Sequence, residues 1–316
     1  MPTGKEGRII NFREAQQYRG CHGPLRWFGG KGRLTGKLKQ LLPNEWATYV
    51  EPFFGGGALF FSLPPAEQEV VADVDPALIG LYRVLQDPES FRRFQNLARF
   101  TPYSRRLICE CQQVQGEDPV ERAWAWWVSV RQSFGGIIGS GWGSVVGSGT
   151  WETGAQTSGG CWLPVVRRLS AIHERLQGVQ VRCDNALSLL PDYLSDKQAF
   201  IYLDPPYVPE TRRARKYKYD MGREEHEHLL ELLVGCSAQV MLSGYDSDLY
   251  KALEEEGWNR TEFEVVCHFA GYTRANRVGG KGAGRKRQPR TEVVWRNYWR
   301  TGESGDRRLP LREVLS

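Results

Sequence analysis

The sequence predicts an α/β fold in which an open sheet is interrupted by an inserted subdomain. Short apolar runs alternate with helical patterns over residues 26–85 and again from residue 163 onward, which is typical of an α/β sheet. One of these runs ends in a glycine-rich turn and another ends in a rigid acidic turn. Open α/β sheets bind ligands at the ends of their strands, so both turns are candidate binding positions. Between the two halves, residues 133–160 are rich in glycine, serine and tryptophan, which indicates an irregular binding loop or hairpin.

The composition of the 316-residue chain is that of a globular protein. Hydrophobic residues make up 41% of it, and the net charge of +5 permits a polyanionic partner without identifying one. Seven irregularly spaced cysteines predict a reducing environment rather than a disulfide framework. No apolar run approaches about 18 residues, and the first residues lack a signal-peptide core. We therefore expect a cytoplasmic protein with no membrane contact, whose polar residues 1–24 form a loose leading segment.

Metal binding is not predicted. Cys109 and Cys111 are separated by one residue, and no second pair completes a four-ligand zinc set. His226 and His228 lie in a strongly polar helical stretch, where histidines are expected on the surface rather than as ligands.

A short strand and a glycine-rich turn are predicted over residues 49–57. The three glycines allow positive φ angles and a close approach of the backbone to a ligand, and a helix is expected to begin at Ala58. The next strand, residues 69–72, ends at Asp73, 18 residues after Gly55. In nucleotide-cofactor folds, the acid that binds the ribose hydroxyls lies roughly 20 residues after the glycine turn, so the spacing found here is close to the expected one. The chain has no Gly-x-Gly-x-x-Gly or Gly-Lys-Ser/Thr motif here, which argues against NAD and against a phosphate loop.

The most informative segment is Asp204-Pro205-Pro206-Tyr207, which follows the apolar strand pattern of residues 199–203. The two prolines restrict φ at successive positions and remove two N–H donors. The result is a stiff corner in which a carboxylate and carbonyl oxygens lie beside an aromatic ring. Such a corner suits a planar heterocycle that carries an amino group, although Asp and Pro are also common in ordinary turns.

Three segments, in their order along the chain, resemble the Dam-type DNA adenine methyltransferases. They are Glu-Pro-Phe-Phe-Gly-Gly-Gly at residues 51–57, Ala-Asp-Val-Asp at 72–75 and Asp-Pro-Pro-Tyr at 204–207. The resemblance extends over most of the chain and includes residues 25–31, 73–82, 182–184, 240–243 and 292–298.

The resemblance implies a Rossmann-like S-adenosylmethionine-dependent methyltransferase sheet with an inserted DNA-recognition subdomain. Residues 1–95 and 166–316 would form the catalytic domain, and residues 96–165 the target-recognition insert. The substrate would be double-stranded DNA, methylated site-specifically at adenine N6. The resemblance also implies a bacterial or phage-encoded, nucleoid-associated enzyme, monomeric or weakly dimeric, and leaves open whether a cognate restriction endonuclease accompanies it.

The same resemblance implies a set of cofactor-binding residues. Trp27 would flank S-adenosylmethionine, Lys31 would engage its carboxylate, Asp73 its ribose and Asp184 its adenine. The full expected set is Trp27, Lys31, Glu51, Pro52, Phe53, Gly55, Gly57, Asp73, Asp184 and Asp204.

The expected catalytic residues are Asp204, Pro205, Pro206 and Tyr207. The lone pair of an adenine amino group is delocalised into the ring, so the nitrogen is a poor nucleophile. The Asp204 carboxylate and the Pro205 carbonyl would accept its protons and localise that lone pair, while Tyr207 stacks on the base. A duplex hides the nitrogen, so the base must be flipped out at a cost of a few kcal/mol.

The expected DNA contacts lie in three places. Phe134 and Trp142 belong to the glycine-rich segment, and Phe134 corresponds to an aromatic wedge in the family. Arg212, Arg213 and Arg215 form a basic run shortly after Tyr207, and Arg26 corresponds to a base-contacting lysine of the family. The family's Asn-Gly-Leu-x-Arg segment is Gly-Gly-Ile-Ile-Gly here, without the arginine that reads guanine, so its Gly-Ala-Thr-Cys target is not predicted for this chain.

Other functions stay open from the residues alone. The same acceptors could hold the N4 amine of cytosine, and methylation of RNA or of a protein amide is a further alternative. A DNA-binding protein with an inactive site is the alternative from another functional class.

Overall fold

A computed structural model of the chain describes residues 8–27, 29–133, 136–139, 162–208, 219–266 and 289–300. The chain forms two compact units. Unit 1 consists of Met1–Leu189 and Gln198–Phe200, and unit 2 of Leu190–Lys197 and Ile201–Ser316.

The strands form a seven-stranded mixed sheet in the order β5-β4-β3-β6-β7-β9-β8, which confirms the predicted α/β class. In unit 1, β3 pairs in parallel with β4, and β4 with β5; in unit 2, β9 pairs antiparallel with β7 and with β8. The strands are β3 (Thr48–Glu51), β4 (Gln68–Ala72), β5 (Gln180–Arg182), β6 (Ala199–Leu203), β7 (Gln239–Tyr245), β8 (Asn259–Val266) and β9 (Pro289–Arg296).

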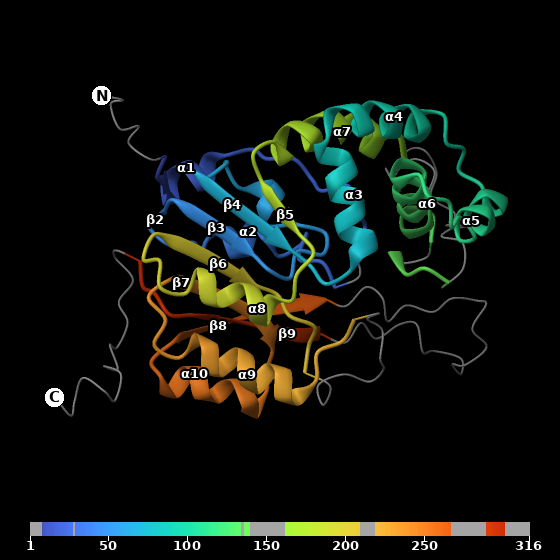
Figure 1. The fold of residues 1–316 in the computed structure, drawn as a ribbon. Coiled ribbons are helices and arrows are strands. Elements are labelled where there is room, and N and C mark those ends of the chain that lie inside the picture. The colour runs from blue at the N-terminus through green and yellow to red at the C-terminus, as the bar shows by residue number, and fades with distance from the viewer. Residues whose placement is uncertain are drawn as a thin grey trace, which may run out of the picture. The chain divides into compact units, whose positions relative to one another are not determined.

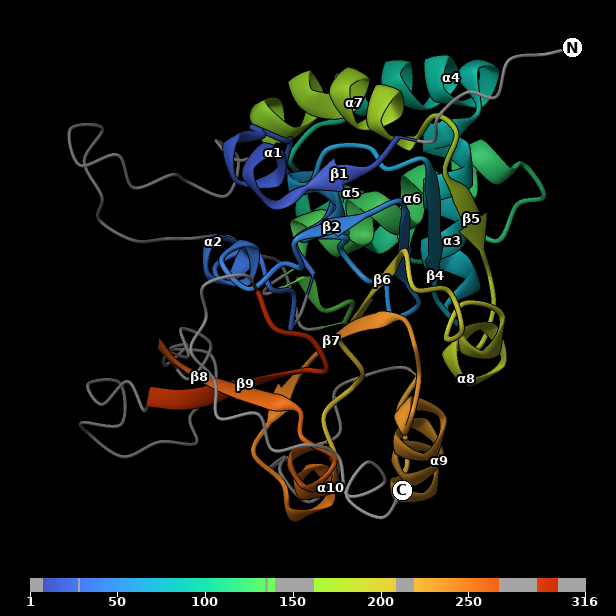
Figure 2. The same cartoon turned by 90° about the vertical axis from the view of Figure 1, so that its left-hand side faces the viewer.

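The start of unit 1 is more regular than the sequence suggested. Strand β1 (Ile10–Asn11) pairs antiparallel with β2 (Glu45–Trp46), and helix α1 (Phe12–Gln17) lies beside them (Figure 2). The expectation of a loose segment over residues 1–24 is therefore wrong for residues 10–17. The side chain of Asn11 caps α1 by accepting a hydrogen bond from the Glu14 N–H at 2.9 Å, and Ile10 is fully buried.

The glycine turn follows β3 as predicted, but the helix expected at Ala58 does not form. Only a short 3-10 turn, η1 (Phe60–Ser62), is present there. Pro64 explains the early stop, because a proline disfavours the helical conformation of the residue before it. Leu63 is accordingly extended, with φ −102° and ψ 149°.

Three helices of unit 1 begin with the same two-residue signal, aspartate followed by proline. Asp75, Asp87 and Asp118 each accept a hydrogen bond from a backbone N–H of the first turn, and the proline stands where no donor is needed. The helices of this unit are α2 (Thr35–Lys39), α3 (Pro76–Gln86), α4 (Pro88–Arg99), α5 (Arg105–Cys111), α6 (Pro119–Gln132), α7 (Trp162–Leu176) and α8 (Ala186–Leu189).

Helices α3, α4, α6 and α7 pack together (Figure 1). Aromatic side chains contact one another between them. The Trp127 ring lies 5.3 Å from that of Phe94 and 4.6 Å from that of Trp162. Its indole N–H donates to the Pro24 carbonyl at 3.0 Å. Helix α6 is therefore anchored to the segment that leads to Trp27.

In unit 2, helices α9 (Arg223–Leu233) and α10 (Lys251–Glu255) lie on the same side of the strands β8 and β9 (Figure 1). His226 of α9 is fully buried, and its Nδ1 lies 2.8 Å from the Tyr250 hydroxyl. The surface position expected for His226 is therefore wrong, whereas His228 is exposed as expected. Burial, with the nearby charge of Asp204, raises the pKa of Tyr250, so its hydroxyl stays protonated in its hydrogen bond with His226.

Within the described ranges, no helix is long and apolar enough to span a membrane.

Candidate active site

The glycine turn of unit 1 needs glycine for two reasons. Gly55 and Gly57 have φ angles of +46° and +60°, a region that residues with a Cβ rarely adopt. A Cβ on Gly55 would also lie 2.5 Å from the indole nitrogen of Trp27, and one on Gly57 would lie 2.6 Å from the Phe54 ring. The turn therefore brings Trp27 against the backbone that follows β3.

Asp73 ties the end of β4 to this turn. One carboxylate oxygen accepts the Gly55 N–H and the other accepts the Asp75 N–H, each at 3.0 Å. Burial raises the pKa of Asp73, although these two N–H donors act in the opposite direction. Each carboxylate oxygen can accept more than one hydrogen bond, so the contacts leave Asp73 able to receive ligand hydroxyls.

Glu51 lies at the end of the neighbouring strand β3. It is buried and accepts a hydrogen bond from the Tyr49 hydroxyl at 2.8 Å. The Tyr82 hydroxyl donates to the Gly55 carbonyl at 3.0 Å, and burial together with Glu51 and Asp73 raises the pKa of Tyr82 well above the ordinary value. Tyr82 therefore stays a neutral donor that fixes the turn through its backbone.

A third acid, Asp184, follows the next parallel strand. Ala72 of β4 is paired with Arg182 of β5, and the Asp73 N–H donates to the Arg182 carbonyl at 3.3 Å. Glu51, Asp73 and Asp184 thus follow or end three adjacent parallel strands, at the edge of the sheet where ligands bind in this fold class. Asp184 is half-buried and forms an ion pair with Arg182.

The other expected cofactor residues surround the same turn in the sequence. Pro52 is buried, Phe53 is half-buried, and the Lys31 side chain is buried with 5% exposed. The Lys31 carbonyl accepts the Leu34 and Thr35 N–H groups and so leads the chain into α2. The Trp27 ring lies 6.2 Å from that of Trp126, which connects this segment to α6.

Arg26 lies against the first residues of the expected recognition segment. Gly136 has a φ of +76°, and a Cβ there would lie 1.9 Å from the Arg26 carbonyl oxygen, so only glycine fits. Arg26 itself is exposed. The other expected DNA contacts lie outside the described residues; they are Phe134, Trp142, Arg212, Arg213 and Arg215.

In unit 2, Asp204 follows the fully buried strand β6, as predicted. The Ser243 hydroxyl of β7 donates to Asp204 Oδ1 at 3.1 Å, and the Tyr202 hydroxyl lies 3.0 Å from the Ser243 oxygen. A serine hydroxyl has one proton, so a chain of hydrogen bonds from Tyr202 through Ser243 ends on the Asp204 carboxylate.

Tyr207 is held at its ring and at its hydroxyl. Its ring is stacked on that of Tyr245, with centroids 3.9 Å apart and planes inclined by 20°. Its hydroxyl donates to Glu292, lying 3.2 Å from both carboxylate oxygens. Of the two prolines between Asp204 and Tyr207, Pro205 is buried and Pro206 is half-buried.

Ser243, Tyr245 and Glu292 were not expected as site residues from the sequence. Ser243 and Glu292 were named only within segments that resemble the family. A polar residue after the apolar run Val-Met-Leu was a signal that Ser243 needs a partner, whereas Glu292 follows the polar residues Arg290 and Thr291 and carries no such signal.

Among the described residues, no three side chains of His, Cys, Asp or Glu gather as possible metal ligands.

Comparison with known proteins identifies relatives. The family of D12 class N6 adenine-specific DNA methyltransferases matches residues 27–106 and 165–265, more than half of the chain. A DNA adenine methylase of Haemophilus influenzae is 25% identical over 257 residues, covering 77% of this chain and 84% of the relative. The type II methyltransferase M1.LlaDCHI of Lactococcus lactis subsp. cremoris is 26% identical over 303 residues, covering 86% and 94%.

A viral protein also matches. The type II methyltransferase M.CviBI of Paramecium bursaria Chlorella virus NC1A is 23% identical over 255 residues, covering 78% of this chain and 90% of the relative. The family match includes the glycine turn, Asp73, Asp184 and the segment from Asp204 to Tyr207. The chain belongs to the D12 class N6 adenine-specific DNA methyltransferases and is an N6-adenine DNA methyltransferase.

Proposed function

We propose that the enzyme takes the methyl group from S-adenosylmethionine, binds that cofactor in unit 1, and holds a flipped adenine of double-stranded DNA at Asp204 and Tyr207 of unit 2. The observation that carries the proposal is the hydrogen bond from Ser243 to Asp204, which orients a carboxylate at the end of a buried strand. Family membership supports adenine N6 over cytosine N4, RNA or protein amides as the methylated group.

The residues of unit 1 fit S-adenosylmethionine. The glycine turn lets the backbone approach a ligand, and Trp27 covers it with an aromatic ring. Asp73 suits ribose hydroxyls because its oxygens keep accepting capacity, and Asp184 suits an adenine amino group at the end of the next strand. When bound, the cofactor supplies a methyl group activated by its sulfonium. The remaining proposed contacts are Lys31, Glu51, Pro52, Phe53, Gly55 and Gly57, with Asp204 at the reacting end.

The residues of unit 2 act on the target base. The Asp204 carboxylate and the Pro205 carbonyl accept hydrogen bonds from the two N–H groups of the amine, which concentrates the nitrogen lone pair toward the methyl group. Pro206 keeps the turn rigid. Since one face of Tyr207 is covered by Tyr245, the opposite face of the ring is the one that stacks on adenine. Catalysis then rests on positioning and on electrostatic stabilisation.

Residues 96–165 form the proposed target-recognition insert, and residues 1–95 and 166–316 the catalytic domain. In support, the family match leaves residues 107–164 unmatched, inside the insert. Phe134, Trp142 and Arg26 would contact the target sequence, and Arg212, Arg213 and Arg215 would contact the phosphate backbone. A cognate restriction endonuclease and a monomeric or weakly dimeric state stay predictions.

The test is expression of the full chain in a host free of DNA methylation, followed by sequencing that detects modified bases. The expected result is N6-methyladenine at one short recurring sequence, with no modification in cells that express Asp204→Ala. N4-methylcytosine, or unmodified DNA from cells with folded wild-type protein, would overturn the proposal.

A further inference from the structure

Strand β7 contacts both functional side chains of the Asp204–Tyr207 segment. Ser243 and Tyr245 are two residues apart on this strand, and side chains at that spacing lie on the same face of a sheet. Ser243 donates to the Asp204 carboxylate at 3.1 Å, and Tyr245 stacks on Tyr207 with centroids 3.9 Å apart. One face of one strand therefore holds the acceptor and the stacking ring.

Glu292 of β9 completes the hold on Tyr207. In the antiparallel pairing of β7 and β9, Glu292 stands directly opposite Tyr245. Residues paired in this way have neighbouring side chains on the same face. Tyr245 supports the face of the Tyr207 ring, and the buried Glu292 carboxylate accepts a hydrogen bond from the Tyr207 hydroxyl. Turning the Tyr207 side chain away would break both contacts together.

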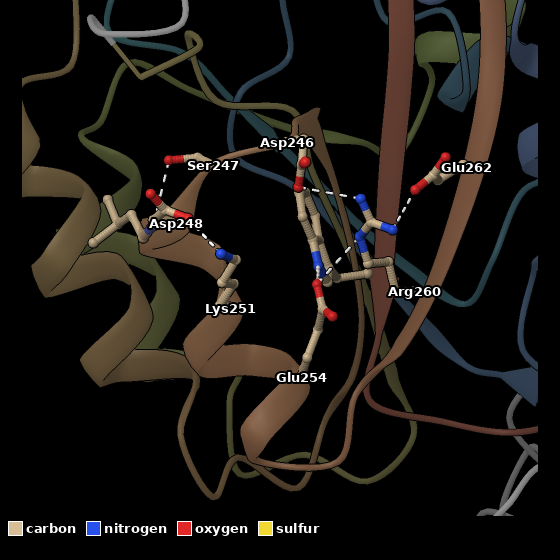
Figure 3. Close-up of polar contacts among 9 residues, drawn as sticks. Asp246, Ser247, Asp248, Lys251, Glu254, Arg260 and Glu262 are labelled. Carbon is tan, nitrogen blue, oxygen red and sulfur yellow. Dashed lines mark hydrogen bonds and ion pairs between the residues drawn. The ribbon is translucent and has the colours of Figure 1, made fainter.

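The end of β7 is itself fastened by an ion-pair network (Figure 3). Arg260 of β8 contacts the carboxylates of Asp246, which follows Tyr245 directly, of Glu254 in α10 and of Glu262. The contacts to Asp246 and Glu254 measure 3.1 and 3.2 Å. A network of this kind resists movement more than an isolated surface pair does. The residue that follows Tyr245 therefore shares an ion-pair network with β8 and α10.

We propose that Ser243, Tyr245 and Glu292 are positioning residues for methyl transfer. They fix the carboxylate plane of Asp204 and the ring plane of Tyr207 before the base binds. The entropic cost of ordering these two groups then does not add to the activation free energy of methyl transfer. The inference rests on the proposed roles of Asp204 and Tyr207. Its effect falls on the rate of methyl transfer and leaves the affinity for the cofactor unchanged.

The test uses the full-length enzyme and DNA carrying the target found by sequencing. Single-turnover methylation rates are measured at saturating DNA and S-adenosylmethionine, together with the cofactor Kd and the Tm. Tyr245→Leu is expected to lower the rate at least tenfold with the cofactor Kd within twofold, and Tyr245→Phe, which keeps the ring, to restore most of it. Ser243→Ala is expected to lower the rate in the same way.

A double-mutant cycle isolates the contact with Glu292. Glu292→Gln should lower the rate about tenfold in the wild-type background but less than twofold in the Tyr207→Phe background, where no hydroxyl is left to orient. Glu224→Gln, which removes an exposed charge from α9, is the matched control. Because the cycle uses no substitution at Tyr245, it still tests the inference if Tyr245→Leu does not fold.

Equal effects of Glu292→Gln in both backgrounds, or losses confined to Tm and cofactor affinity, would overturn the inference while leaving the proposed function intact. A folded wild-type enzyme that methylates no adenine would overturn both. A rate loss that Tyr245→Phe does not restore would show that the stacked ring is not what acts on Tyr207.

Discussion

The guanidinium of Arg175 in α7 makes a two-point ion pair with the carboxylate of Glu69 in β4, at 2.6 and 2.7 Å, and both side chains are buried. The same guanidinium lies 3.7 Å from the centre of the Phe60 ring and donates to the Phe60 carbonyl. Glu69 also accepts the Ala66 N–H at 3.1 Å. Helix α7, which begins at the end of the proposed insert, is thus fastened to the strand that precedes Asp73 and to the 3-10 turn that follows the glycines.

Replacing Arg175 should strongly destabilise unit 1. Arg175→Met leaves the Glu69 carboxylate buried without its partner, and breaking a buried pair on one side costs about 3–5 kcal/mol. Urea denaturation measures this loss. Arg167→Met, an exposed position on the same helix, should change the free energy of unfolding by less than about 0.5 kcal/mol. Similar losses in both variants would show that the pair does not stabilise the fold.

Cofactor binding should depend on Asp73 and not on a metal. Asp73→Ala removes the proposed ribose acceptor and leaves the Gly55 and Asp75 N–H groups without theirs, so calorimetric titration should show affinity for S-adenosylmethionine at least tenfold weaker. Binding to the wild-type enzyme should persist in EDTA. Loss of binding on chelation would contradict this prediction.

The affinity for the cofactor should fall as the pH is lowered. The pKa of Asp73 is raised by burial, so the carboxylate becomes protonated at a higher pH than an exposed aspartate would. The protonated form has one acceptor fewer for ribose hydroxyls, and binding therefore weakens as the pH falls through this raised pKa. Titration calorimetry from neutral to acidic pH measures the change, and Asp73→Asn should show a flatter dependence.

Methyl transfer should depend on Asp204 far more than cofactor binding does. Its carboxylate is proposed to act on the target amine, more in the transition state than in the ground state. Asp204→Ala should abolish turnover while the Kd for S-adenosylmethionine stays within a few fold. Appreciable residual turnover would show that another group is the principal acceptor.

Phe134 and the arginine run should affect DNA binding in different ways. Phe134→Ala should weaken base flipping and sequence discrimination with little change in salt dependence. Replacement of Arg212, Arg213 and Arg215 by alanine should weaken binding to all sequences alike and reduce the log–log salt slope by about 0.9 for each phosphate that is no longer neutralised. Binding titrations at several salt concentrations distinguish the two, and identical behaviour would contradict the division.

Local sequence patterns correctly predicted individual strands and the glycine turn. The apolar run 199–203 and the glycine turn with Asp73 formed as expected, because burial and positive φ leave clear signals in sequence. The helix expected at Ala58 is replaced by a short 3-10 turn, which ends before Pro64. His226 was misplaced because its neighbours in sequence are polar, while its partner Tyr250 lies 24 residues away.

The residues that hold the motif were harder to find, because they act through contacts distant in sequence. Glu292 is 85 residues from Tyr207, and Ser243 is 39 residues from Asp204. Nothing local marks either as a partner of the motif. Only the pairing of β7 with β9 brings Glu292 next to Tyr245 and so to Tyr207.

The hydrogen bond from the Gly55 N–H to Asp73 makes one backbone amide a reporter of events at the end of β4. An amide proton exchanges with solvent only when its hydrogen bond opens. A molecule that binds the closed turn lowers the frequency of opening and slows exchange at Gly55. Deuterium uptake at this single amide would therefore follow occupancy in unit 1 without a labelled ligand, without DNA and without turnover.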